Sequence, residues 1–118
     1  MILGIGNDII EIARIQAAIE RYQGRFLDRV FTPREQSYCQ SKKEAARHFA
    51  GRFAAKEAVV KALGTGFSQG LTWLDVEILN DEAGKPHVYL SFSLKQGASM
   101  LISISHCKEY ATAMAVWE

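Results

Sequence analysis

Two acidic residues, Asp8 and Glu57, lie next to apolar residues, where a carboxylate needs water, a hydrogen-bond donor or a cation as its partner. Asp8 closes a short apolar segment, so its carboxylate must be solvated, cap a helix that follows, or bind a cation. Glu57 falls within roughly 40–60° of Phe53 and Val60 around a helix, at the margin of the apolar face. From spacing alone, an ion pair with Lys61 is the simplest explanation of Glu57. Two such acids brought together would suit Mg²⁺, which commonly takes one or two carboxylates plus phosphate and water oxygens.

The helix that carries Glu57 is locally basic. Such an excess is usually a solvated face, but it could also bind a ligand with several phosphates. The segment GTGFSQG at 64–70 would add backbone N–H donors. It lacks the GK[ST] ending of a Walker loop and follows a helix, so ending that helix is its simplest role. The charged residues are Lys42, Lys43, Arg47, Arg52, Lys56 and Lys61, against only Glu44 and Glu57.

Two further groups could bind or react. Ser105 and His106 close a strand at a turn, where a lone histidine is more often structural than catalytic. A nucleophilic pair of His106 and Cys107 is not supported, because neighbours on a strand point to opposite faces and no third group is evident. Arg14, Arg21 and Arg25 lie at positions i, i+7 and i+11 of an expected helix, within roughly 40° of one another, and Arg25, near the helix end, is most simply a solvated residue. They form a basic ridge that is either a solvated face or a docking surface for an acidic partner.

These residues are positioned by an expected α+β fold in one domain over residues 1–118, with an N-terminal strand and helices followed by antiparallel strands. Apolar spacing predicts the helix 11–26, and Thr32-Pro33-Arg34-Glu35 predicts the capped start of the next. The segment 94–100 is ambiguous and could hold one or two helical turns. The expected elements are a strand at 2–7, helices at 11–26, 33–41 and 43–63, and strand pairs at 73–79 with 87–92 and at 101–105 with 110–117.

The composition excludes several classes of protein. The chain has 118 residues, of which 48% are hydrophobic and 23% charged, with a net charge of +1. A net charge this small produces no overall electrostatic field that would attract nucleic acid or a membrane surface. No apolar run approaches about 18 residues, and the apolar start lacks the basic region of a signal peptide. With two cysteines in no metal-binding spacing, a cytoplasmic protein is expected.

Taken together, the motifs resemble the bacterial holo-acyl-carrier-protein synthases, a family of phosphopantetheinyl transferases. The similarity runs nearly end to end and in order. KEAVVKALGTG together with the N-terminal G-x-D is its most specific part. The matching segments are GIGNDIIEIARI at 4–15, FTPRE at 31–35, RFAAKEAVVKALGTG at 52–66, WLDVEILNDEAGKP at 73–86 and SISHCKEYATAMAVWE at 103–118.

The resemblance implies a role for each matching residue. Asp8 and Glu57 would hold Mg²⁺, and Lys61 would lie beside the transferring phosphate. Arg14, with Arg21 on the same ridge, would face the acyl carrier protein. The contacts to coenzyme A would come from Arg52, Lys61, Gly64, Thr65, Gly66, Ser105 and His106. A homotrimer with coenzyme sites between neighbouring subunits is also implied.

The implied reaction moves 4′-phosphopantetheine from coenzyme A to a serine of the apo-carrier protein, giving the holo form and adenosine 3′,5′-bisphosphate for fatty acid biosynthesis. The catalytic residues would be Asp8, Glu57 and Lys61, with Glu57 or a metal-bound water accepting the serine proton. Two alternatives stay open. A Mg²⁺-dependent phosphohydrolase would turn over coenzyme A without a carrier, and a binding module would form no product.

Overall fold

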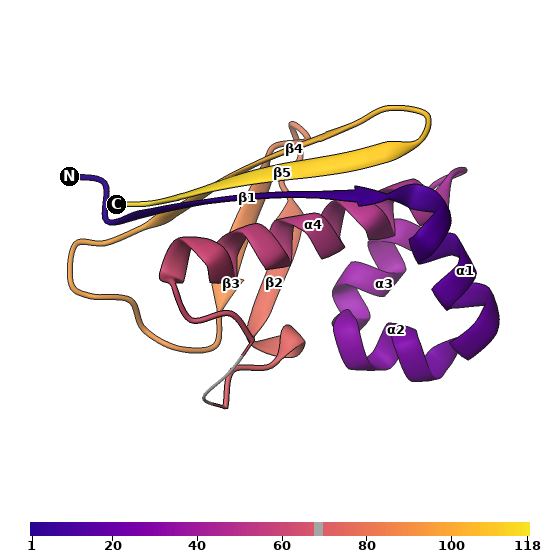
Figure 1. Ribbon diagram of the computed structural model, residues 1–118, viewed down its shortest axis with the longest axis horizontal. Helices are drawn as coiled ribbons and strands as arrows, with labels where there is room; N and C mark the ends of the chain where they lie inside the picture. Colours follow the sequence, from indigo (N-terminus) through magenta and orange to yellow (C-terminus); the bar gives the residue numbers. More distant parts are fainter. Residues whose placement is uncertain (68–69) are drawn as a thin grey trace.

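The computed structural model describes residues 1–67 and 70–118, which form two antiparallel sheets and a long central helix (Figure 1). Strands β1, β5 and β4 form one sheet in that order, and β2 pairs with β3 in the other. This is the α+β architecture that the sequence predicts. The elements are β1 (Gly4–Glu11), α1 (Ile12–Tyr22), α2 (Gly24–Val30), α3 (Pro33–Gln40), α4 (Ala45–Leu63), the 3₁₀ turn η1 (Trp73–Asp75), β2 (Val76–Asn80), β3 (Pro86–Leu90), β4 (Met100–His106) and β5 (Tyr110–Trp117).

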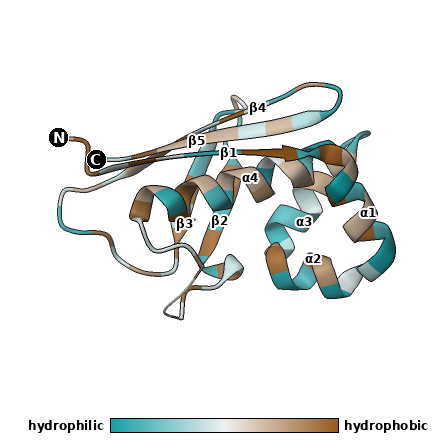
Figure 2. Ribbon diagram, viewed as in Figure 1, coloured by the Kyte–Doolittle hydropathy of each residue, from teal (hydrophilic) through white to brown (hydrophobic). Residues whose placement is uncertain are grey.

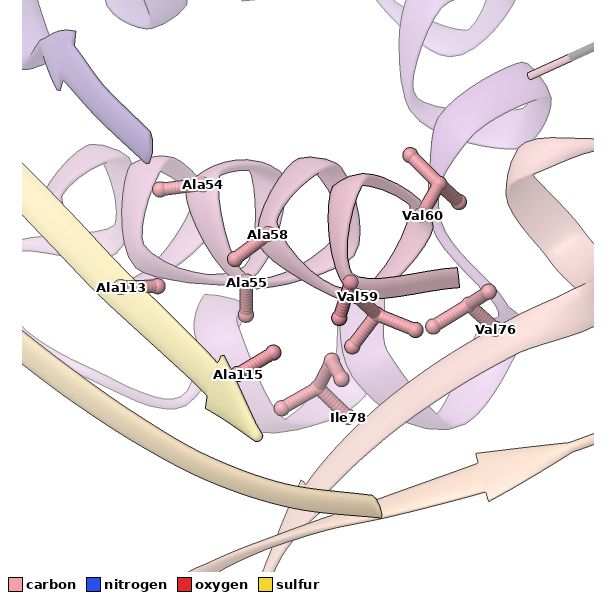
Figure 3. Close-up of a cluster of buried hydrophobic side chains, with 10 residues drawn as sticks. Ala54, Ala55, Ala58, Val59, Val60, Val76, Ile78, Ala113 and Ala115 are labelled. Carbon is pink, nitrogen blue, oxygen red and sulfur yellow. The ribbon is translucent and has the colours of Figure 1, made fainter. Parts of the chain in front are cut away.

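Helix α4 lies along one face of the three-stranded sheet, and most of its circumference is buried (Figure 1). Apolar residues accordingly run along α4, whereas polar stretches are frequent in α1 and α3 (Figure 2). Small side chains on both partners allow the helix and the sheet to approach closely. Figure 3 shows Ala54, Ala55 and Ala58 of α4 near Ala113 and Ala115 of β5, with Val59, Val60, Val76 and Ile78 continuing the cluster toward β2.

Strand β1 packs its backbone directly on α4. A Cβ atom added to Gly6 would overlap the carbonyl oxygen of Ala58, and one added to Gly4 would overlap that of Ala62. Only glycine fits at these two positions, because the helix backbone occupies the space that a side chain would need. The alternation of residues along a strand then places Asp8 on the same face, toward α4.

The expected end of the first strand, at residue 7, is wrong. The hydrogen-bonded register between β1 and β5 continues from Gly4 opposite Trp117 to Glu11 opposite Tyr110. Asp8 therefore lies within the sheet, opposite Ala113, and does not cap a helix. The hydrogen bonds between β1 and β5 outweigh any local preference for a helix that begins directly after Asp8.

The single helix expected at 11–26 is divided in two. Gln23 has a φ of 48°, which interrupts the helix between α1 and α2. Consequently Phe26 and Arg25 belong to α2, and Phe26 contacts Phe31 edge to face at 5.9 Å between ring centroids. Gly24, directly after the break, is the residue in the sequence that indicates an interruption of the helix. The helical spacing of the apolar residues on both sides of it nevertheless predicted one continuous helix.

The remaining expectations hold with small shifts. Thr32 and Glu35 form the predicted capping box of α3, and Gly64, with a φ of 81°, ends α4. Residues 73–75 form a 3₁₀ turn before β2 instead of the start of a strand. The ambiguous segment 94–100 contains no helix, because a turn at Gly97 (φ of 80°) leads into β4.

Lys56 is completely buried, together with Glu35, where α4 meets several neighbouring elements. Its ammonium donates to the carboxylate of Glu35 at 2.7 Å, to the carbonyl of Val30 at 2.6 Å and to that of Trp73 at 3.0 Å. The other oxygen of Glu35 accepts from the N–H of Ile78 at 2.7 Å. All three ammonium protons have acceptors, so this pair fixes α4 relative to α3, η1 and β2.

Candidate active site

The carboxylate of Asp8 meets α4 at Lys61. Asp8 Oδ1 is 3.0 Å from the Nζ of Lys61, and the same ammonium donates to the carbonyl of Asn7 at 3.0 Å. The hydroxyl of Thr112 on β5 donates to the backbone carbonyl of Asp8 at 2.8 Å, which fixes this part of β1. The Asp8 side chain is 16% exposed, whereas that of Lys61 is 51% exposed. The cluster is thus accessible from solvent but held on rigid elements.

Glu57 lies one helical turn before Lys61 and within electrostatic range of Asp8. Partial burial raises the pKa of Glu57, the negative charge of Asp8 raises it further, and Lys61 lowers it. The ion pair of Lys61 is formed with Asp8, so the i, i+4 pair with Glu57 that spacing favours is wrong. Two carboxylates of one chain therefore share a single neighbouring ammonium, and the cluster carries an excess negative charge.

This excess charge fits a divalent cation. Within residues 1–67 and 70–118, no group of three or more His, Cys, Asp or Glu side chains could enclose a metal ion. Mg²⁺ is nevertheless commonly bound by only one or two protein carboxylates, and substrate phosphates and water supply its remaining oxygen ligands. The raised pKa of Glu57 supports this match, because a nearby cation would favour the ionised carboxylate, which burial and the charge of Asp8 both disfavour.

Arg52 and His106 lie together in a cavity that Asp8, Glu57 and Lys61 do not line. Both line a cavity of about 180 Å³ that also includes His48 and Tyr38. Arg52 is only 3% exposed, its guanidinium carbon lies 4.2 Å above the ring of Tyr38, and its terminal nitrogen donates to the side chain of Asn80. Its Nε has no hydrogen-bond partner in the described part of the chain. A buried guanidinium with a spare donor is suited to an anion.

The glycine loop forms a third location, directly beyond α4. Gly64 and Gly66 have φ of 81° and 61°, and the hydroxyl of Thr65 donates to the carbonyl of Gly66 at 3.1 Å. Thr65 also lines a separate, mainly apolar cavity of about 500 Å³ with Leu63 and Trp117. Ser68 and Gln69, within the GTGFSQG segment, lie outside the described residues. The loop begins less than one helical turn after Lys61 in the sequence.

Ser105 is not brought to the cavity of His106. It is exposed on β4 and lies opposite Thr112, whereas Ile104 faces α4 at Gly51. Because neighbouring residues of a strand point to opposite faces, Ser105 lies on the outer face of the sheet. Within one chain, the residues expected to contact the coenzyme therefore occupy separate places.

The expected docking ridge is present in part. Arg14 and Arg21 are exposed on α1, about a third of a turn around the helix from the buried Ile15. Arg21 lies 5.3 Å above the ring of Tyr22. Arg25, which the notional continuous helix would have added to the ridge, belongs to α2 beyond the break at Gln23.

Comparison with known proteins identifies the family. A family model described as the 4′-phosphopantetheinyl transferase superfamily matches residues 4–115. The chain belongs to this superfamily. It is 68% identical to the holo-[acyl-carrier-protein] synthase of Protochlamydia amoebophila over 120 residues, covering 99% of this chain and 98% of that protein. The corresponding protein of Chlamydia pneumoniae is 48% identical, with 98% and 96% covered.

Solved structures of phosphopantetheinyl transferases have the same fold. A holo-(acyl-carrier-protein) synthase from Bacillus anthracis, in complex with CoA (3′,5′-ADP), is 41% identical and has a TM-score of 0.88, with 100% of this chain and 97% of that chain covered. The Helicobacter pylori enzyme in complex with coenzyme A is 36% identical and has a TM-score of 0.85, with 97% and 99% covered.

Some groups in this phosphopantetheinyl transferase escaped sequence reasoning. His48 lies beside His106, with ring centroids 5.7 Å apart, and burial together with Arg52 lowers its pKa. Tyr38 and Asn80 reach Arg52 from other elements, so no local pattern marks them. Lys56, which the basic pattern assigned to a solvated or phosphate-binding face, is buried against Glu35 instead.

Proposed function

We propose that this protein is a holo-acyl-carrier-protein synthase, which transfers 4′-phosphopantetheine from coenzyme A to a serine of an apo-acyl-carrier protein. The products are the holo-carrier and adenosine 3′,5′-bisphosphate. The observation that carries this proposal is the cluster of Asp8, Glu57 and Lys61 in a chain whose relatives bear that name. Two carboxylates and one ammonium provide charge neutralisation and alignment, which are the main requirements of phosphoryl transfer.

Lys61 and Glu57 have different roles in the proposed reaction. The carrier serine forms a new bond to the phosphorus next to pantetheine, and the bond from that phosphorus to the bridging oxygen breaks. The bridging oxygen takes the electron pair, and Lys61 offsets the charge that develops there. Either Glu57 or a water held at the proposed metal site would accept the serine proton.

Asp8 and Glu57 are the residues that would hold Mg²⁺. The ion would neutralise the pyrophosphate of coenzyme A and favour attack at phosphorus. Lys61, which pairs with Asp8, is half exposed, so its ammonium would be accessible to a phosphate bound beside the two carboxylates.

Arg52 and His106 are proposed to bind a phosphate of the coenzyme, and the Gly64–Gly66 loop to contact it beside the acidic cluster. Both groups lie in one chain but in separate cavities. A site assembled between neighbouring subunits would allow one subunit to supply the acidic cluster and the next to supply Arg52 and His106. Ser105, on the outer face of the sheet, would then lie near the subunit boundary.

A homotrimer, which the family resemblance implies, is also proposed, and the exposed apolar side chains on the outer face of the three-stranded sheet support an association of subunits there. Ile5, Ile9, Met114 and Leu101 are 68%, 63%, 50% and 49% exposed. The alternation along β1, β4 and β5 places these side chains on the face opposite α4. Several large apolar side chains exposed on one face are typical of an interface between proteins.

Met114→Glu is expected to separate the subunits, because a charge at the centre of an apolar interface must be desolvated. Light scattering should show the assembly of the unmodified protein and a monomer for the variant, with activity lost in parallel. Tyr89→Glu, a charge placed on an exposed residue of β3, is the matched control and should leave the assembly intact. A monomeric unmodified protein at working concentration would contradict the shared site.

Arg14→Glu is expected to reduce kcat/KM for the carrier protein by at least about tenfold at low salt, since charges at the rim of an interface mainly set association. Arg21→Glu should do so more mildly. Coenzyme A binding, measured by calorimetry, should remain nearly unchanged. The loss of activity with added salt should also become flatter.

The matched control for the ridge is Lys95→Glu, a charge reversal of an exposed residue in the loop between β3 and β4. Figure 1 shows this loop at the opposite end of the molecule from α1. Equal carrier kinetics in Arg14→Glu and the unmodified protein would mean that the carrier docks elsewhere.

The proposed function is tested by release of adenosine 3′,5′-bisphosphate from coenzyme A with Mg²⁺, in the presence and absence of apo-carrier protein. A transferase should release it only when the carrier is present, in equal amounts with the holo-carrier. Release without a carrier would indicate a phosphohydrolase, and binding without release would indicate a binding module.

A further inference from the structure

The glycine loop after α4 begins at Gly64, whose N–H donates to the carbonyls of Val60 at 3.0 Å and Lys61 at 3.1 Å. Gly64 and Gly66 both adopt positive φ, and a Cβ added to either would meet no atom within 4 Å. Open space therefore lies where a side chain would project from either glycine. Phe67 is the first large side chain after the helix, and its contacts therefore bear directly on the conformation of the loop.

The ring of Phe67 lies on that of Trp73. Their centroids are 4.0 Å apart and their planes differ by 28°. Trp73 in turn stacks on Phe53 of α4, at 4.8 Å and 27°. Three rings from three separate segments therefore form a continuous stack that connects the loop to the middle of α4. Stacked aromatic pairs contribute more than their buried area alone.

Trp73, in the middle of this stack, is held by hydrogen bonds of its own turn. The buried ammonium of Lys56 donates to the carbonyl of Trp73 at 3.0 Å, and Glu35 holds that ammonium at 2.7 Å. Asp75, in the same 3₁₀ turn, accepts from the hydroxyl of Ser91 at 2.6 Å and from the N–H of Thr72 at 2.7 Å. Trp73 is thus fixed to α4 and to the body of the protein. Because Phe67 stacks on Trp73, the position of Phe67, and with it the end of the loop, is restrained as well.

We infer that Phe67 is a positioning residue, which holds Gly64–Gly66 in the conformation that contacts the coenzyme by stacking on Trp73. The inference rests on the proposed function for the role of the loop, but the stack itself is a property of the chain. If the ring is removed, the loop populates other conformations, and the apparent affinity for coenzyme A falls in proportion to the competent fraction. Asp8, Glu57 and Lys61 are untouched, so the chemical step is retained.

Phe67→Ala is expected to raise the KM and the Kd for coenzyme A by about tenfold, with kcat changed by less than about twofold. Phe67→Tyr keeps the ring and should restore both values. Phe67→Leu keeps apolar volume without a planar ring and should be intermediate. Tyr89→Ala, which removes an exposed ring of β3, is the control for general loss of an aromatic residue.

Amide hydrogen exchange of Gly64, Thr65 and Gly66, measured without coenzyme, tests the anchor independently of the reaction. Exchange at these residues should accelerate in Phe67→Ala and not in Phe67→Tyr, while exchange within α4 remains slow. Unchanged exchange, or a loss of kcat with unchanged coenzyme affinity, would overturn the inference. If the unmodified protein binds no coenzyme A, the proposed function fails, but the exchange measurement still decides whether Phe67 orders the loop.

Discussion

Asp8→Asn and Glu57→Gln are each expected to reduce phosphopantetheine transfer by about 10²-fold or more, because each removes one of two carboxylates assigned to a single cation. Asp8 touches Lys61, and Glu57 senses the charge of Asp8, so the two acids act as one unit. The double variant should therefore be little worse than either single variant. Steady-state turnover of apo-carrier protein at saturating coenzyme A and Mg²⁺ measures the effect.

Thermal unfolding provides the control for Glu57→Gln. The folded pKa of Glu57 is raised, so the ionised carboxylate destabilises the fold, and this cost appears as the pH rises through that pKa. Without metal, Glu57→Gln should unfold at a higher temperature than the unmodified protein at neutral pH, and the difference should shrink in acid. Mg²⁺ should raise the unfolding temperature of the unmodified protein only. Near-normal turnover in Glu57→Gln would contradict the assignment of Glu57 as a ligand of the cation.

Lys61→Ala is expected to lower kcat by about 10²-fold while changing the KM for coenzyme A by less than about threefold. The reason is that the ammonium is needed most when charge develops on the leaving phosphate. Single-turnover kinetics with a saturated enzyme separate this effect from product release.

Binding of Mg²⁺ provides the control for Lys61. Removing the ammonium that now pairs with Asp8 leaves the cluster more negative, so Lys61→Ala should bind Mg²⁺ as tightly as the unmodified protein, or more tightly. A variant with unchanged kcat and a raised KM would show that Lys61 is a binding residue only.

Local sequence patterns predicted the elements well where the decisive interactions are local. The capping box of Thr32 and Glu35 and the left-handed Gly64 both involve residues within a few positions of one another. By contrast, β1 extends past Asp8 because of hydrogen bonds to β5, at the other end of the chain. No local pattern contains that information, and the helix start expected near Asp8 was therefore wrong.

The site shows the same division. Spacing paired Glu57 with Lys61, whereas the structure pairs Lys61 with Asp8, because Gly4 and Gly6 bring β1 onto the backbone of α4. The alternation of these glycines with Asp8 is visible in the sequence, but the helix that they meet is not. Likewise, Lys56 belongs to a basic pattern and is nevertheless buried, since Glu35 and two carbonyl groups from distant segments satisfy it.

The most direct measurement of the proposed function is the mass of an intact apo-acyl-carrier protein after incubation with this protein, coenzyme A and Mg²⁺. A single phosphopantetheine should be added, at a serine, and the addition should depend on Mg²⁺ and be lost in Asp8→Asn and Glu57→Gln. A carrier of unchanged mass, under conditions in which coenzyme A binds, would contradict the proposed transfer.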